Sequence, residues 1–152
     1  MIQRIQTVYL FLVIVLCISC LFAGVGEWTL EGETVASMSN FTYSKEGLEP
    51  ATTAPCYGLG VLLILVVLLT IPTILLFRKR MRQLRLAIFS TILLVGYVAL
   101  YVFYAWAFTA EGTTFRFLLP ATFPVVSIVL NALAIHGIRK DEALVRSLDR
   151  LR

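Results

Sequence analysis

Charged side chains are scarce in this sequence. They make up 14% of its 152 residues, whereas hydrophobic residues make up 59%. Ordinary soluble domains carry about 25% charged and about 45–50% apolar residues. A soluble domain of this length has a large surface relative to its volume and could not cover it with so few polar groups. The composition therefore excludes an ordinary soluble domain and predicts a single membrane domain over residues 1–152.

Ionisable residues are absent from the long apolar runs. No Asp, Glu, Lys or Arg falls within the runs at residues 5–25, 55–77, 86–108 and 117–138. Each run has about the 20 residues that a helix needs to cross about 30 Å of hydrocarbon. We therefore expect an all-α membrane protein, an antiparallel bundle of four transmembrane helices. Transporters and proton pumps keep costly ionisable groups in mid-span, so their absence argues against coupled transport.

Histidine and cysteine are also rare, with one and three residues. His136 lies near the end of the fourth run, where we interpret it as an interfacial residue. None of the cysteines has His or Asp neighbours at a metal-binding spacing, so no metal or cofactor is expected. Cys17 and Cys20 are one helical turn apart, a spacing that can mark a redox pair. Burial in an apolar helix disfavours the reactive thiolate, so we predict a reduced pair that serves helix packing.

The first run has to be distinguished from a cleaved signal. The stretch from Cys17 to Cys20 loosely resembles the site at which bacterial lipoproteins are cut and lipidated. The third residue before Cys20 is a cysteine rather than a leucine, and the apolar run continues through Ala23. We therefore expect the first run to be retained as a membrane span.

Basic residues are distributed unevenly along the chain. Eleven of the thirteen lie at Arg4, in the segment 78–85 and in the tail 139–152. The two opposite segments hold only Lys45 and Arg116, together with several glutamates. Lys and Arg next to membrane spans are retained in the cytoplasm, which predicts that both termini are cytoplasmic. The same placement explains the positive net charge without a nucleic-acid partner.

The segment 26–54 is the only long polar stretch between spans and is expected on the outer side. Strand-like residues at 28–30 and 35–43, around the turn residues 31–33, allow a small β-hairpin there. The triplet from Asn40 to Thr42 matches a glycosylation pattern that is common by chance.

The tail at residues 139–152 is predicted to be a cytoplasmic amphipathic helix. Leu144, Leu148 and Leu151 recur at helical spacing, and Glu142 precedes Arg146 by four residues. Such an apolar stripe needs cover, so we expect this helix on the membrane surface or against the inner ends of the spans.

A few polar side chains lie inside the apolar runs. Ser127 and Asn131 share one face of the fourth run, and Tyr97 of the third run is expected at the depth of Ser127. Buried hydroxyl and amide groups need hydrogen-bond partners, so these three residues form a candidate polar intramembrane face. We interpret the face as a contact between helices, with a small polar pocket as the alternative.

The two ends of the chain resemble those of a known family. The opening residues 1–7, MIQRIQT, and the closing residues 138–152, IRKDEALVRSLDRLR, flank four spans. In this arrangement the chain resembles a family of small inner-membrane proteins from Bacteroidota that carries a domain-of-unknown-function label. The resemblance implies a bacterial cytoplasmic membrane and a four-helix layout. It implies no activity and no catalytic or binding residues.

No catalytic motif is present, so we expect a protein that is not an enzyme. The sequence favours a non-catalytic structural or accessory component of a membrane complex, surrounded by lipid and bound to another membrane protein or to a second copy of itself. One alternative is a small pore or carrier for neutral solutes built around Ser127 and Asn131. The other is a membrane thiol oxidoreductase that uses Cys17 and Cys20.

Overall fold

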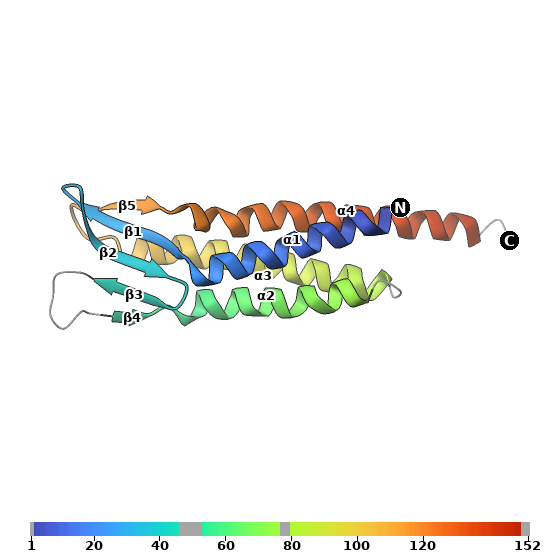
Figure 1. Ribbon diagram of the computed structural model, residues 1–152, viewed down its shortest axis with the longest axis horizontal. Helices are drawn as coiled ribbons and strands as arrows, with labels where there is room; N and C mark the ends of the chain where they lie inside the picture. The colour runs from blue at the N-terminus through green and yellow to red at the C-terminus, as the bar shows by residue number, and fades with distance from the viewer. Residues whose placement is uncertain (1, 46–52, 77–79, 150–152) are drawn as a thin grey trace.

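The computed structural model of the chain describes residues 2–45, 53–76 and 80–149. Within these residues the chain forms four long α-helices, a short 3-10 helix and five β-strands (Figure 1). In chain order the elements are α1 (Ile2–Phe22), β1 (Gly24–Leu30), β2 (Glu33–Ser39), β3 (Thr42–Lys45), β4 (Thr53–Pro55), α2 (Tyr57–Leu75), α3 (Arg80–Ala107), β5 (Thr114–Phe117), the 3-10 helix η1 (Leu119–Thr122) and α4 (Phe123–Asp149).

The long helices run side by side along the long axis of the molecule (Figure 1). α1 packs against α2 and α4, and α3 packs against the same two helices. The start of α1, the end of α2, the start of α3 and the end of α4 lie at one end of the molecule (Figure 1). The strands lie at the opposite end, which we call the sheet end.

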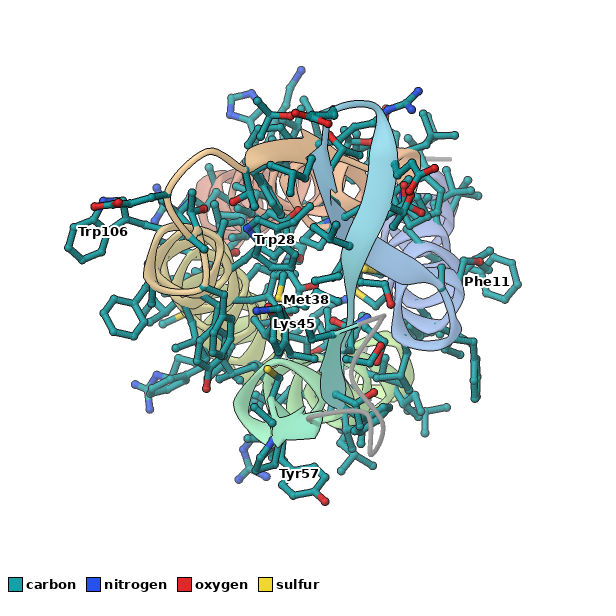
Figure 2. The ribbon with its side chains drawn as sticks, turned by 90° about the vertical axis from the view of Figure 1, so that its left-hand side faces the viewer. Phe11, Trp28, Met38, Lys45, Tyr57 and Trp106 are labelled. Atoms are coloured by element: carbon teal, nitrogen blue, oxygen red, sulfur yellow. The ribbon has the colours of Figure 1, made fainter. Side chains whose placement is uncertain are left out.

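The surface of the helices is apolar. In the described part of the chain, four helical segments are long and apolar enough to cross a membrane: Ile5–Phe22, Tyr57–Leu75, Met81–Ala107 and Leu119–Leu144. Phe11 and Trp106 point away from the molecule (Figure 2), with 59% and 79% of their surface exposed. Monomeric soluble proteins rarely expose such contiguous apolar surface. The structure thus agrees with the predicted membrane protein.

The expectation of an all-α fold is wrong, because the chain also forms a five-stranded antiparallel sheet with strand order β4-β3-β2-β1-β5. Of the residues expected to allow a hairpin, 28–30 lie in β1, whereas 35–43 form most of β2, the following turn and the start of β3. Glu31 and Gly32 connect these strands with φ of 53° and 93°, as a two-residue hairpin loop favours. The other strands have only three or four residues, too few for a clear alternating pattern.

The helix boundaries also differ from the predicted runs. α1 ends at Phe22 rather than at residue 25, because β1 begins at Gly24. The run predicted at 117–138 begins with Phe117 in β5 and passes through η1 before α4 starts at Phe123. Apolar residues suit a buried strand as well as a membrane helix, so hydrophobicity alone could not place these boundaries.

The tail predicted as a separate amphipathic helix at 139–152 continues α4. This helix runs without a break to Asp149 and extends along the axis of the molecule (Figure 1). Leu144 is half exposed. The Leu148 side chain and all of Leu151 lie outside what the structure describes. The described part of the tail is therefore an extension of the fourth helix and not a helix turned onto its end.

Aromatic side chains hold the sheet on the far end of α3. The buried ring of Trp28 in β1 packs against three other rings at centroid distances of 4.8–6.3 Å: Tyr43, Phe108 and Phe115. Alternate residues of a strand point to the same face, so Met38 of β2 lies near Trp28 at the centre of the molecule (Figure 2). Burial raises the pKa of the Tyr43 phenol above its ordinary value.

Candidate functional site

Asn40 joins the sheet to two helices. It lies in the turn between β2 and β3, and its side chain is completely buried. Its Nδ2 donates to the Cys20 carbonyl oxygen of α1 at 2.5 Å, and its Oδ1 accepts from the Tyr97 hydroxyl of α3 at 2.7 Å. Cys20 belongs to the last turn of α1, where carbonyls lack partners within the helix. The Asn40 amide therefore caps α1 and binds α3 at the same time.

The same turn also contacts a third helix. The Gly60 amide of α2 donates to the Asn40 carbonyl at 2.9 Å, and the Cys56 amide donates to the Phe41 carbonyl at 2.8 Å. The Phe41 ring lies so close to Gly60 that a Cβ at this position would overlap it. Glycine is thus required on α2 at this contact. Because Asn40 is buried and bonded, the triplet from Asn40 to Thr42 offers no accessible amide for glycosylation.

The chain's three cysteines, all within the described residues, are buried free thiols. The Cys17 thiol donates to Ser127 Oγ on α4 at 3.9 Å, and Cys20 Sγ lies 3.7 Å from the Tyr97 hydroxyl. Each thiol of this pair thus contacts a polar side chain of another helix. In the described part of the chain, no group of three or more His, Cys, Asp or Glu side chains could hold a metal ion.

A second polar cluster lies further from the sheet. Asn131 of α4 donates through Nδ2 to Ser90 Oγ of α3 at 3.1 Å and, more weakly, to the Ala87 carbonyl at 3.5 Å. Ser90 Oγ lies 3.3 Å from Thr70 Oγ1 of α2, which itself donates to the Val66 carbonyl at 2.7 Å. The Ser90 proton is therefore directed to Thr70. This chain of hydrogen bonds connects α4, α3 and α2.

One atom of this second cluster has no partner. Asn131 Oδ1 is the buried side-chain oxygen that, among the described residues, makes no hydrogen bond. A buried acceptor without a donor costs about 1–3 kcal/mol. The amide of Asn131 therefore contributes less to stability than its two donated bonds alone suggest.

A hydrogen bond joins α1 and α4 at the end of the molecule opposite the sheet. Gln6 Nε2 donates to Asp141 Oδ2 at 2.8 Å, and both side chains are nearly buried. A Cβ at Gly137 would lie 2.9 Å from Gln6 Cγ, so this glycine leaves room for the Gln6 side chain. The contact fixes the two helices that carry the ends of the described chain.

The predicted polar face does not form one surface. Tyr97 joins Asn40 and Cys20, Ser127 meets Cys17, and Asn131 belongs to the second cluster with Ser90 and Thr70. Asn40, Ser90 and Thr70 were not predicted to contact these residues. Isolated hydroxyls are common in apolar helices, and the only sequence signal at Asn40 was the glycosylation triplet. The signal for Tyr97 and Asn131 was their need for hydrogen-bond partners inside an apolar helix.

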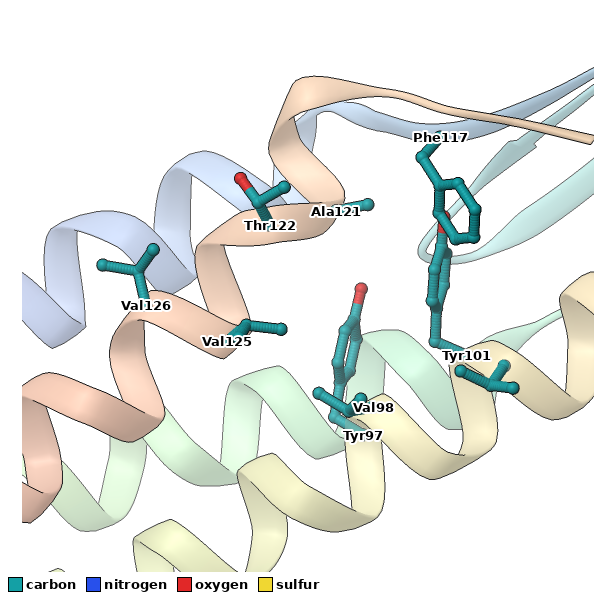
Figure 3. Close-up of a pocket in the computed structure, with 9 residues that line it drawn as sticks. Tyr97, Val98, Tyr101, Phe117, Ala121, Thr122, Val125 and Val126 are labelled. Atoms are coloured by element: carbon teal, nitrogen blue, oxygen red, sulfur yellow. The ribbon is translucent and has the colours of Figure 1, made fainter.

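A cavity of about 300 Å³ lies between α3 and α4 near the sheet end (Figure 3). Its walls come from α3, from η1 with the start of α4, and from β5: Tyr97, Val98, Tyr101, Val102, Phe117, Ala121, Thr122, Val125 and Val126. Neither Ser127 nor Asn131 lines it. The cavity is therefore separate from the solute pocket that the sequence offered as an alternative.

The comparisons with known proteins agree with the resemblance of the chain ends to a family of unknown function. Among curated proteins, none matches the chain. Residues 2–151 match the model of a family described as a domain of unknown function, DUF4293. Since this match spans nearly all of the 152 residues, the chain belongs to the DUF4293 family.

Proposed function

We propose that this protein is a non-catalytic accessory component of a membrane complex, with its sheet exposed on the outer face of a bacterial cytoplasmic membrane. The orientation follows from charge. Arg4 of α1, Arg82 of α3 and Arg139 of α4 all belong to the end opposite the sheet (Figure 1). Basic residues beside membrane spans stay in the cytoplasm, so both termini are inside and the sheet is outside.

The observation that carries this proposal is the way Asn40 fastens the sheet to the helices. Its side chain binds α1 and α3, and its carbonyl accepts from α2. A single residue, Ala23, separates α1 from β1, and β5 leads through η1 into α4. A sheet that merely followed a flexible linker would need none of these bonds. The arrangement suits a rigid platform that presents one surface at a fixed height and angle.

The free face of the sheet carries a polar row. Arg116, Glu27, Ser37 and Ser44 are successive register partners on β5, β1, β2 and β3. Because residues alternate between faces, this row points away from the side on which Trp28 is buried. Ser37 Oγ and Ser44 Oγ lie 2.9 Å apart and are hydrogen-bonded to each other at the β3 end of the row. A partner that docks here meets a basic and an acidic side chain at one end of the row and two hydroxyls at the other.

The polar groups inside the helices support the same proposal. The Ser90 hydroxyl donates a hydrogen bond to Thr70, and the Thr70 hydroxyl donates to a backbone carbonyl. The Cys17 thiol contacts Ser127. A solute carrier built around Ser127 and Asn131 would instead need these groups to line an open polar cavity. A thiol oxidoreductase would need Cys17 or Cys20 beside a cation or an acceptor that activates it. The interior polar side chains are bonded between helices, and this favours an accessory role.

The test is purification of the full chain in mild detergent, with the stoichiometry of any bound protein measured. We expect a membrane protein, or a second copy, at a fixed ratio. Glu27→Lys reverses the charge in the polar row and should reduce the bound partner at least fivefold. Glu111→Lys makes the same change at an exposed position outside the strands and serves as the matched control. A folded chain that always purifies alone as a monomer contradicts the proposal.

A further inference from the structure

The cavity between α3 and α4 is open to the side. Val102 and Phe117 at its margin are 55% and 65% exposed, and Val125 is half exposed. Its two long walls belong to helices that are apolar enough to cross a membrane. The opening therefore faces the hydrocarbon of the bilayer, in the half that lies nearer the sheet. We call this cavity the lateral crevice.

The wall contributed by η1 and α4 is built from small side chains. Ala121, Thr122 and Val125 stand opposite Tyr97 and Tyr101 (Figure 3). The two tyrosine rings are stacked with centroids 6.4 Å apart and planes at 5°, and both line the α3 side of the crevice. An apolar cavity of about 150 Å³ already accepts benzene. A crevice of about 300 Å³ has room for a longer hydrocarbon segment.

The hydroxyl protons of the crevice are already committed. The Tyr97 hydroxyl donates to Asn40 Oδ1, the Tyr101 hydroxyl to the Val25 carbonyl and the Thr122 hydroxyl to the Leu119 carbonyl, each at 2.7 Å. These are the hydroxyl groups among its lining residues. A polar ligand would lose its hydration without gaining a donor here, which is unfavourable. The part of a ligand that enters the crevice should therefore be pure hydrocarbon.

A basic residue, Arg116, is next in sequence to the residue that covers the crevice. Phe117 forms the roof of the crevice from β5, and the preceding residue is Arg116, which is exposed. Within the described residues Arg116 makes no ion pair, although Glu27 is its register partner. A guanidinium binds phosphate oxygens with paired hydrogen bonds, and its long side chain can reach the membrane interface. Successive residues point to opposite faces of a strand, so the Arg116 side chain leaves β5 on the face opposite Phe117. Because β5 is an edge strand, this long side chain can curve around the edge of the sheet toward a headgroup at the mouth of the apolar crevice.

We propose that the lateral crevice holds one acyl chain of a phospholipid whose phosphate is bound by Arg116. The phospholipid comes from the leaflet nearer the sheet, which is the outer leaflet in the orientation proposed above. Binding of the lipid itself does not depend on the accessory role. A lipid that binds only the folded protein also stabilises the contact between α3 and α4.

The experiment counts retained lipids. The full chain is reconstituted in nanodiscs of phosphatidylethanolamine and phosphatidylglycerol, transferred to mild detergent and analysed by native mass spectrometry. We expect one phospholipid per chain for the wild type. Ala121→Trp fills the crevice and should lower the occupied fraction at least tenfold, while Arg116→Gln should lower it severalfold. Ile92→Trp on the exposed surface of α3 and Lys45→Gln on the sheet are the matched controls and should retain the lipid.

A second measurement locates the lipid. Phe117→Trp adds a fluorophore at the roof to the native Trp28 and Trp106. A retained phospholipid with brominated acyl chains should quench the added fluorescence, measured as the difference from the wild type, while leaving that added by Ile92→Trp unquenched. Val125→Phe replaces Ala121→Trp if that variant does not fold. Equal lipid retention by a folded crevice-filling variant overturns the proposal. A co-purified quinone bound in the crevice also overturns the proposal, and so does a dimer that dissociates when Ala121→Trp is introduced. In either case the crevice has an occupant other than an acyl chain.

Discussion

The hydroxyl of Tyr97 donates to Oδ1 of Asn40 at 2.7 Å across 57 residues of sequence. This bond, with that from Asn40 to the Cys20 carbonyl, is buried between the sheet and the helices. Removing the Asn40 amide deprives the Tyr97 hydroxyl of its acceptor and the Cys20 carbonyl of one donor. The position of the sheet relative to α1 and α3 therefore depends on this side chain together with the bond from the Tyr101 hydroxyl to the Val25 carbonyl and the ring packing around Trp28.

Asn40→Ala should lower the free energy of unfolding by about 1–3 kcal/mol, because it removes two buried hydrogen bonds and leaves the Tyr97 hydroxyl with only its long contact to Cys20 Sγ, while the Cys20 carbonyl keeps the Ala23 amide at 3.3 Å. Thermal unfolding in detergent measures the change, and Thr34→Ala on the exposed surface of β2 is the control. Tyr97→Phe removes only the bond between the two side chains. In a double-mutant cycle the two substitutions should be strongly coupled. Additive effects would contradict a direct contribution of this bond.

Asn131→Leu should have a smaller effect, about 1 kcal/mol or less. It removes bonds of 3.1 Å and 3.5 Å, but it also removes the buried Oδ1 that has no partner. The comparison with Asn40→Ala in the same unfolding assay checks this order. Partner binding should survive the substitution. Loss of partner binding without a change in melting temperature would instead indicate a functional polar site at Asn131.

The membrane character could be predicted from the sequence, but of the sheet only the hairpin could be. Four apolar runs without charge are a strong signal, because an ionisable group in hydrocarbon is costly. β5 has four residues and pairs through Thr114 with Thr29, 85 residues away. No local pattern encodes such a pairing. Phe117 lines the crevice, and its apolar side chain extends the run that was predicted to be the fourth membrane span.

The candidate site was also predictable only in part, because its contacts join residues that are distant in sequence. A tyrosine within an apolar run needs a partner, which identified Tyr97. Its main partner, Asn40, comes from a polar turn that contacts the end of α1, the start of α2 and the side of α3. Sequence spacing relates residues within one helix, whereas this contact depends on how the sheet sits on the helices. The sequence therefore indicated the need for a bond and not its geometry.

Cysteine labelling should establish the orientation in the membrane. The native Cys17, Cys20 and Cys56 are buried, so an impermeant maleimide should not label the wild-type chain. Thr34→Cys on the sheet should react in intact cells, and Arg82→Cys at the start of α3 should react only after the membrane is opened. Labelling of Arg82→Cys from outside would reverse the proposed topology.

The cysteine pair should be dispensable for any activity of the complex. Cys17→Ala with Cys20→Ala removes two long sulfur contacts, to Ser127 and Tyr97, and should cost about 1–2 kcal/mol in unfolding free energy. Partner binding should be unchanged. Alkylation before and after unfolding, followed by mass spectrometry, measures the state of the thiols. A bridge between the two sulfurs in the native protein would revive the oxidoreductase alternative.

Two glycines offer a matched test of how tightly the sheet sits on α2. A Cβ at Gly60 would overlap the Phe41 ring, whereas a Cβ at Gly96 on α3 meets no atom within 4 Å. Both substitutions to alanine raise helix propensity by about 1 kcal/mol. Gly96→Ala should therefore stabilise the protein slightly, while overpacking in Gly60→Ala should lower the unfolding free energy by about 1–3 kcal/mol. Phe41→Leu combined with Gly60→Ala should recover part of that loss, because a smaller side chain relieves the overlap. If Gly60→Ala melts at or above the wild-type temperature, the Phe41 ring does not pack tightly against α2 at Gly60.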